Sequence, residues 1–469
     1  ALPFVRAVRP FHPAYKLEEE LLQSVMAAST GPVRVNLLVM ARGDDARVAA
    51  WIEAQGGSVF ERSSQARFLS AELGHELLAE LASLDEVQWI ERWGPRVMNL
   101  DLAREFHGAN HVEALHGLTG TGVRVEVMDL GFDLTHPDLQ NHMRHGSISP
   151  GAHGTCTAGI LTGDGIGDPN ARGMAPDSFL VVAETDIFGS RYEHTAELVD
   201  PSGPYQCVLQ SNSWSSSPET DAYNSIAAQL DTILFDFPKI SILHAMGNTG
   251  NQVCSRETWS KNVISVGGIF HRNSLITADD DWDQGASIGP ARDGRVKPDI
   301  VSFYDMVRCT DVVGNGGYSS GDYYSAFSGT SAATPLVAGS LALIYEMWHL
   351  GLFGNPHAGA TPFENAPFNT TAKALLLNSA TQYAFSGTVH DMTRTHQGWG
   401  RPDLEKLADS LGRMVVVDEA TVLTNLSSRY YGLEVLPGET ELHATLVYRD
   451  PSGTTTAGLH RINDLDLTL

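Results

Sequence analysis

The first hundred residues alternate between a period of two, typical of half-buried strands, and a helical period. This pattern predicts strands over 33–40, 58–63, 67–71 and 87–90, and a helix over 45–55 that ends at two glycines. An apolar stripe predicts a second helix, and its members are Leu73, Leu77, Leu78 and Leu81. The resulting β-α-β-β-α-β order is that of a ferredoxin-like α+β domain.

Beyond residue 100, short buried segments end or begin at polar residues. Residues 123–128 alternate like a strand and end in Asp129, and residues 240–246 form a buried strand pattern just before Asn248. His153 and Ser331 each stand at the start of a helix of small and apolar residues. Because open α/β sheets keep their sites at the carboxyl edge of the strands, the pattern predicts an α/β domain with a site at that edge.

The chain returns to strand-like alternation at its other end. Beyond about residue 413, residues 414–417, 441–449 and 462–469 alternate between apolar and polar positions. About fifty residues are few for a closed β-sandwich. We therefore expect a β-rich segment that is either truncated or completed by residues outside this sequence.

Asp129, His153 and Ser331 together carry the chemistry of nucleophilic catalysis. A serine at a helix N-terminus lies among unpaired N–H groups that favour developing negative charge, although Gly-Thr-Ser is also a common helix cap. An aspartate and a histidine upstream favour the first interpretation, since a histidine must take the proton from a weakly nucleophilic hydroxyl. The chain order Asp, His, Ser is one of several in which this triad occurs.

The motifs resemble those of the subtilisin-like serine protease (subtilase) family. The resemblance rests on Asp129-Leu130-Gly131, on His153-Gly154-Thr155, and on the Gly-Thr-Ser-Ala-Ala-Thr-Pro segment of residues 329–335. It departs at Leu130, where the family usually has Ser or Thr. It implies a three-layer α/β core with a parallel central sheet and a serine endopeptidase that acts through an acyl-enzyme.

The same resemblance implies the remaining site residues. Asn248, in a Gly-Asn-x-Gly turn, matches the side chain of the oxyanion hole, which the backbone N–H of Ser331 would complete. One wall of the S1 pocket is implied for Ser213, Trp214 and Ser215, where many relatives have glycine at the last position. The other wall is implied for Ala245, Met246 and Gly247. The floor falls within residues 254–259, which do not match the usual pattern, so the preference for the P1 residue stays open.

The resemblance also implies a domain organisation. Subtilases commonly carry a ferredoxin-like propeptide, so residues 1–98 are interpreted as an inhibitory propeptide domain of a zymogen, with an unrelated accessory domain as the alternative. We expect the extended tail 93–100 to occupy the cleft and processing to occur between residues 97 and 101. The catalytic domain is then predicted over 99–413 and the β-rich segment, which resembles a β-sandwich of larger subtilases, over 414–469.

Composition limits the partners and the environment of the protein. The 31 basic and 56 acidic residues give a formal net charge of −25, which disfavours nucleic acid and anionic membranes. No apolar run is long enough to span a membrane. The chain starts at Ala1 without a methionine or a signal peptide, so we expect that it has been trimmed. Length and composition agree with an extracellular enzyme, and we expect the enzyme to be secreted.

Cofactor and cysteine usage complete the prediction. The chemistry requires no cofactor, but the acidic run 279–283 is a candidate for a structural calcium ion, with a solvated loop as the commoner alternative. Four cysteines are too few for a disulfide framework, and their pairing stays open. The alternative function is a catalytically silent subtilase-fold binding protein, which would normally have lost a member of the triad.

Overall fold

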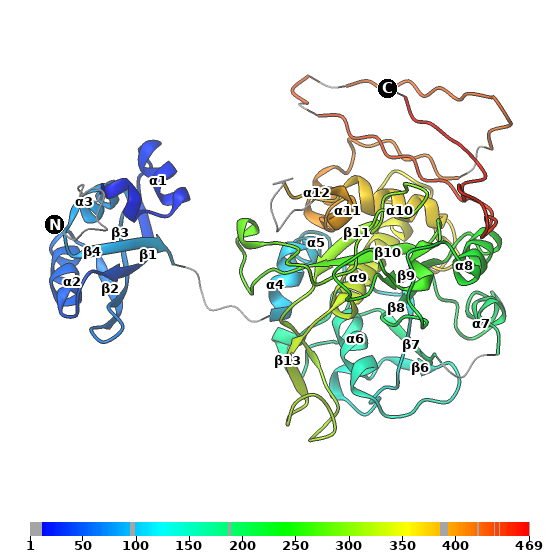
Figure 1. Cartoon of the computed structure of the whole chain (residues 1–469), viewed down its shortest axis with the longest axis horizontal. Coiled ribbons are helices and arrows are strands. Elements are labelled where there is room, and N and C mark those ends of the chain that lie inside the picture. Colours follow the sequence, from blue (N-terminus) through cyan, green and yellow to red (C-terminus); the bar gives the residue numbers. More distant parts are fainter. Residues whose placement is uncertain are drawn as a thin grey trace, which may run out of the picture. The chain divides into compact units, whose positions relative to one another are not determined.

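A computed structural model describes residues 12–93, 99–185, 189–384, 393–419, 422–435, 437–439 and 441–468 of the chain. The chain divides into two compact units, Ala1–Arg96 and Val97–Leu469, called here the smaller and the larger unit. Figure 1 shows the elements of each unit, and each unit is described by itself.

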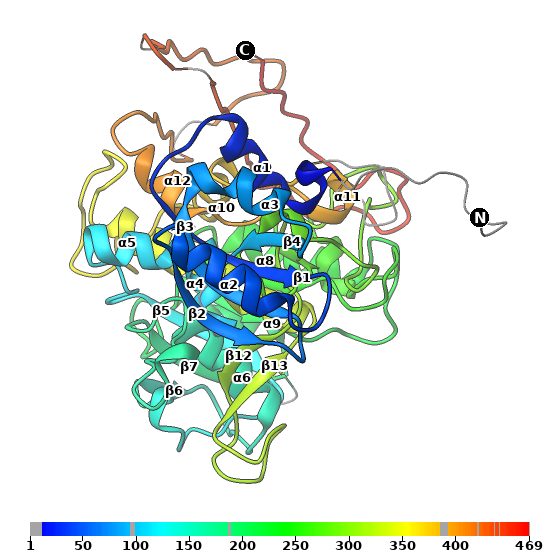
Figure 2. The same cartoon turned by 90° about the vertical axis from the view of Figure 1, so that its left-hand side faces the viewer.

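The smaller unit is a four-stranded antiparallel sheet with strand order β2-β3-β1-β4. Figure 2 looks onto α2 with β1 and β2 behind it. The β-α-β-β-α-β order confirms the predicted ferredoxin-like fold, to which an N-terminal helix is added. The elements are α1 (Glu19–Met26), β1 (Pro32–Val39), α2 (Asp44–Ala54), β2 (Ser58–Ser63), β3 (Phe68–Gly74), α3 (Leu78–Ser83) and β4 (Val87–Arg92).

The smaller unit has a hydrophobic core of its own. Alternate residues of the strands, such as Val35 and Leu37, pack against Val48 and Ile52 of α2. The predicted second helix is shorter than expected, because Leu73 lies in β3 opposite Val33 of β1 and does not belong to the helix. Its apolar side chain is buried by strand pairing, which a pattern of leucines alone does not distinguish from a helical stripe.

A seven-stranded sheet with order β11-β10-β9-β8-β5-β7-β6 forms the centre of the larger unit. All its strand pairs are parallel, which confirms the predicted parallel central sheet. The strands are buried on both faces, as is usual for parallel sheets, except the edge strand β6. They are β5 (Arg124–Asp129), β6 (His142–Arg144), β7 (Phe179–Glu184), β8 (Leu209–Asn212), β9 (Ser241–Ala245), β10 (Ile264–Ile269) and β11 (Ile300–Phe303).

Helices cover both faces of this sheet and complete the three layers. Leu243 of β9 faces the core formed with α6 and α9, whereas its neighbour Ile242 faces the core formed with α7 and α8. A two-stranded antiparallel ribbon, β12 with β13, packs beside α6. These elements are α6 (Ala152–Thr162), α7 (Arg191–Leu198), α8 (Ser225–Asp236), α9 (Thr330–His349), β12 (Val307–Thr310) and β13 (Tyr323–Phe327).

The remaining helices lie around this core. They are α4 (Asn99–Phe106), α5 (Ala109–His116), α10 (Asn369–Asn378), α11 (Arg394–Gln397) and α12 (Leu404–Asp409). Because α4 begins at Asn99, the last residues of the predicted extended tail are helical, while residues 94–98 of that tail lie outside the described residues. The predicted processing region starts in the same stretch.

The predicted strands of the C-terminal segment are not found. Among the described residues beyond Asp409 no strand is present, and Val415, Val417 and Leu442 are about half exposed or more. Alternation produces a strand only where a neighbouring strand pairs with its N–H and C=O groups, and no such pairing occurs here. The described residues between 414 and 468 therefore do not form the predicted strands, while the bounds of this segment stay a prediction.

Residues 449–463 instead fold as a loop that packs near α8, against Lys261 and Tyr223 of the same unit. Asp450 is buried and accepts hydrogen bonds from Lys261 Nζ at 2.6 Å and from the backbone nitrogens of Ile462 and Asn463. The ring of His460 stacks on that of Tyr223 at 4.4 Å between centroids. A buried ion pair and a stacked ring pair therefore hold the loop in place.

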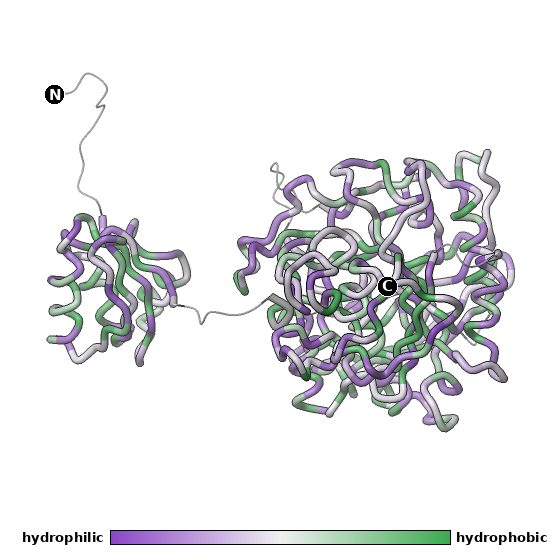
Figure 3. Tube along the Cα trace, turned by 90° about the horizontal axis from the view of Figure 1, so that it is seen from below, coloured by the Kyte–Doolittle hydropathy of each residue, from purple (hydrophilic) through white to green (hydrophobic). Residues whose placement is uncertain are grey.

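No described helix is both long and apolar enough to cross a bilayer. Figure 3 shows hydrophobic and hydrophilic residues interspersed along both units.

Candidate active site

Asp129 and His153, predicted as the acid and the base, are in direct contact. Asp129 ends β5 and His153 lies in the first turn of α6. The Nδ1 atom of His153 is 2.6 Å from Oδ1 of Asp129, which is completely buried. This contact assigns the proton to Nδ1 and leaves the lone pair of Nε2 free to accept a proton.

Two further donors fix the Asp129 carboxylate. The backbone N–H of Leu130 donates to Oδ1 at 2.6 Å, and the Thr157 hydroxyl donates to Oδ2 at 3.0 Å. Leu130 replaces the usual Ser or Thr of the family, yet its main chain still binds the carboxylate, while its side chain is exposed. The substitution therefore leaves the orientation of Asp129 intact.

Burial and charge act in opposite directions on His153. Burial of the ring, against which Phe327 packs edge-on at 5.4 Å, disfavours the charged imidazolium. The charge and hydrogen bond of Asp129 outweigh burial and raise the pKa of His153 above its usual 6.5. His153 is therefore a stronger base than a free imidazole.

Ser331 and Ser213 hold each other at the start of α9. The Ser331 hydroxyl donates to the Ser213 carbonyl oxygen at 3.1 Å, and the Ser213 hydroxyl donates to the Ser331 carbonyl oxygen at 3.0 Å. The latter carbonyl is available because Pro335, four residues later, has no N–H to donate to it. In the described residues no hydrogen bond joins Ser331 Oγ to His153, and such contacts commonly form only once substrate is bound.

Asn248 is arranged as a free donor beside Ser331. Its Oδ1 accepts hydrogen bonds from the N–H and the hydroxyl of Thr330, at 2.9 and 3.1 Å. With Oδ1 occupied, Nδ2 faces away and has no acceptor within the described part of the chain. A Cβ atom on Gly329, whose φ is +88°, would lie 3.1 Å from Nδ2, so glycine keeps this space open.

A cavity of about 190 Å³ lies next to Ser331 and Asn248. It receives all the predicted substrate-binding residues except Met246, whose side chain is buried in the core against Trp259 and Cys254. Ser255 lies in the segment 254–259, which was predicted to contain the floor of the S1 pocket. Sequence analysis did not identify Glu219 and Thr249 as lining residues. The lining consists of Ser213, Trp214, Ser215, Glu219, Ala245, Gly247, Asn248, Thr249, Ser255, Thr330 and Ser331.

The acidic run proposed for calcium does not gather its carboxylates. Asp281 and Asp283 both pair with Arg272, while Asp280 is turned toward the Tyr383 hydroxyl at 2.8 Å. Burial raises the pKa of Asp280 to about 7, so this side chain is a poor ligand for a hard cation at neutral pH.

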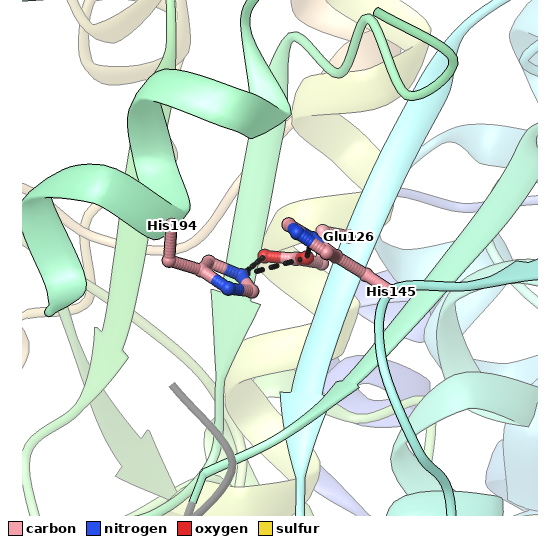
Figure 4. Close-up of side chains that lie close together, drawn as sticks. All are labelled: Glu126, His145 and His194. Carbon is pink, nitrogen blue, oxygen red and sulfur yellow. Dashed lines mark hydrogen bonds and ion pairs between the residues drawn. The ribbon is translucent and has the colours of Figure 1, made fainter. Parts of the chain in front are cut away.

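Within the described residues, one group of three potential metal ligands is present: Glu126, His145 and His194. Sequence analysis missed it, although a glutamate inside the apolar strand β5 was a signal. Figure 4 shows both rings directed toward the Glu126 carboxylate, with Nδ1 of His145 at 2.9 Å and Nε2 of His194 at 3.0 Å. Gln210 donates to the same carboxylate at 2.6 Å.

The geometry of this group is that of a buried ion cluster. The two imidazole rings are stacked, 3.9 Å apart and 16° from parallel, so one ion cannot lie in the plane of both rings. Burial would raise the pKa of Glu126, but the two histidines lower it to about 2. The pKa of His145 is raised by its carboxylate partners despite burial, so the cluster is held by charge.

The four cysteines are all free and buried. Burial raises the pKa of the Cys156 thiol, which lies three residues after His153. A buried neutral thiol is a small apolar residue and a weak nucleophile.

The fold and this arrangement define an open α/β protein with aspartate, histidine and serine at the carboxyl edge of a parallel sheet. The chain belongs to the subtilase family, whose sequence profile matches residues 120–400, and it is a serine protease.

Two relatives, both proteases by name, agree with this family. "Serine protease AprX" from Bacillus subtilis (strain 168) is 27% identical over 313 residues, which cover 58% of this chain and 67% of that protein. "Subtilisin E" from the same strain is 25% identical over 325 residues, covering 62% and 74%. The solved "Structure of Prenylagaramide maturation protease PagA" matches with a TM-score of 0.49 and 19% identity, covering 66% of this chain and 99% of that one.

Proposed function

We propose that this protein is a secreted serine endopeptidase in which Asp129, His153 and Ser331 form the catalytic triad. The observation that carries the proposal is the buried Asp129 bonded to His153 Nδ1. His153 lies in α6, which packs against α9, the helix that Ser331 opens beside a cavity. The proposed substrates are proteins and peptides. Nucleic acid and membranes are not expected to bind, given the net charge of −25.

In the proposed reaction, Ser331 Oγ attacks the carbonyl carbon of the scissile bond while its proton passes to His153 Nε2. Asp129 stabilises the imidazolium that forms. The imidazolium then gives the proton to the leaving amine, and the acyl group stays on Ser331. A water molecule, deprotonated by His153, attacks this ester and releases the second product.

The oxyanion of each tetrahedral intermediate would bind to Asn248 Nδ2 and to the backbone N–H of Ser331. The latter lies in the first turn of α9, where N–H groups have no acceptor within the helix. Losing one such donor costs about 3–4 kcal/mol of transition-state stabilisation. No metal ion takes part in the proposed steps.

Substrate backbone would pair with the chain that follows β8, namely Ser213, Trp214 and Ser215, as an added strand. Ala245 and Gly247 form the opposite wall of the cavity. Met246, which belongs to the same predicted wall, would make no side-chain contact with substrate, because its side chain is fully buried. The Met246 side chain packs in the core behind Ala245 and Gly247.

The smaller unit is proposed to be the inhibitor of the larger one. Its own core supports independent folding, so the polypeptide 1–98 can be made alone and added to enzyme that lacks it. We expect inhibition at a stoichiometric concentration. Full activity at a large excess of this polypeptide would instead favour the accessory-domain alternative.

Hydrolysis of casein and its block by phenylmethylsulfonyl fluoride test the proposed function. Ser331→Ala is expected to lower kcat by about 10⁶-fold, since the triad acts as a unit. A Ser331→Ala protein that keeps a tenth of wild-type activity would exclude this nucleophile. If the wild-type protein folds but hydrolyses no substrate, that result would favour the alternative, a catalytically silent binding protein. No described residue favours this alternative.

A further inference from the structure

The S1 cavity contains an acidic side chain that the proposed mechanism does not use. Glu219 lines the cavity of about 190 Å³ together with Ser331, the candidate nucleophile. Its carboxylate reaches the opposite wall, because a Cβ atom on Gly247 would lie 3.1 Å from Glu219 Oε1. A long side chain bound in this cavity can therefore contact the carboxylate.

No cation of the described chain neutralises Glu219. The Ser215 hydroxyl is its hydrogen-bond partner, at a long 3.4 Å, and no lysine, arginine or histidine nitrogen of the described residues lies within 4.0 Å. The nearby Asp221, by contrast, pairs with Arg292 at 2.7 Å. Glu219 is half-buried, so its charge is only partly solvated and is available to a ligand.

A second polar group in the cavity lacks a partner. Ser255 is 1% exposed and lines the same cavity, and its hydroxyl makes no hydrogen bond within the described residues. A buried hydroxyl without a partner costs free energy that a ligand with an N–H donor can recover. The cavity thus offers a carboxylate and a hydroxyl acceptor, with Ala245 and Trp214 as apolar walls.

We propose that Glu219 determines specificity in S1 and that the enzyme cleaves after basic residues, arginine above lysine. The inference rests on the proposed endopeptidase function. The methylene stem of the P1 residue would pack on Ala245 and Trp214, and its charged head would pair with Glu219. Arginine is favoured because its planar fork can donate to the carboxylate and to Ser255 at once.

The test compares fluorogenic peptides that differ only at P1, carrying Arg, Lys, Met, Phe or Glu. A phosphonate active-site titrant gives the concentration of competent enzyme in each preparation. We expect the wild type to show kcat/KM about 10- to 100-fold higher for Arg than for Met, which matches a hydrogen-bonded charge pair. A preference for Phe or Met in titratable enzyme would overturn the proposal while leaving the endopeptidase function intact.

Variants distinguish a specific role of Glu219 from a general effect of negative charge near the cavity. In Glu219→Gln the Arg/Met ratio should fall about 10-fold or more, and Glu219→Lys should favour a P1 Glu substrate. Asp221→Asn, which lies outside the cavity, is the matched control and should keep the wild-type ratio. An unchanged ratio in Glu219→Gln, or an equal loss in Asp221→Asn, would refute the assignment. Failure of wild-type protein to bind the titrant and to cleave any peptide would overturn the endopeptidase function itself.

Discussion

Replacing Asp129 by asparagine tests how the triad is held. The asparagine side chain has one oxygen and one NH₂ group. Its oxygen should take the place of Asp129 Oδ1, because that position accepts hydrogen bonds from both Leu130 N and His153 Nδ1. The NH₂ group would then face Thr157, whose hydroxyl can donate instead to the Gly154 carbonyl, 3.1 Å away. The structure therefore predicts that the variant keeps the histidine tautomer and loses the charge.

The expected loss of kcat follows from the distance between the Asp129 carboxylate and the His153 ring. A unit charge 2.6 Å from the imidazolium is worth about 6 kcal/mol at an effective dielectric constant of about 20. The dipole of asparagine recovers a part of this. At 1.36 kcal/mol per tenfold change, we expect the lost charge alone to lower kcat by about 10⁴-fold.

The assay is kcat and kcat/KM on a peptide substrate across the pH range, with thermal unfolding as a check on folding. In the wild type, activity falls on the acid side as His153 protonates, at a midpoint above 6.5 because its pKa is raised. The midpoint should move to lower pH in Asp129→Asn. Thr157→Val, which removes one hydrogen bond and no charge, should cost far less. A kcat within tenfold of wild type, or an unmoved midpoint, would refute the reasoning.

Three further predictions concern stability and oxidation. Glu126→Gln should lower the free energy of unfolding by about 3–5 kcal/mol near pH 6. The difference from wild type should shrink as the pH falls from 4.5 toward about 2, because wild-type Glu126 then also becomes protonated. A difference in urea unfolding that stays constant with pH would contradict this. Asp450→Ala should lower stability by about 3 kcal/mol and expose residues 449–463 to limited proteolysis, because Lys261 loses its closer carboxylate partner and keeps only Asp231, at 4.0 Å. Unchanged cleavage would contradict it. Dilute peroxide should leave most activity, since Ala332 after the nucleophile cannot be oxidised and Met246 is buried; rapid inactivation would contradict this.

Sequence could predict a site residue where a polar residue stands at the end of a buried strand or at the start of a buried helix. Asp129 at the end of β5, and His153 and Ser331 at the starts of α6 and α9, are such cases. In each, the local pattern gives both the element and the position of the side chain at its end. The structure brings the first two into contact, while their catalytic roles stay predictions.

Contacts that depend on tertiary structure could not be predicted in this way. His145 and His194 reach Glu126 from 19 and 68 positions away in the chain. Glu219 enters the cavity because its loop is held by the pairing of Thr220 with Cys254, which is distant in the sequence. The alternation around Val415 predicted a strand, but alternation specifies a strand only where a partner strand exists.

The most direct test of the triad is to map where a fluorophosphonate reacts. After incubation of the wild type and digestion, mass spectrometry should find the adduct on Ser331 alone, and His153→Ala should abolish it, because the hydroxyl then has no base. An adduct on another serine, or undiminished labelling of the folded His153→Ala protein, would contradict the account.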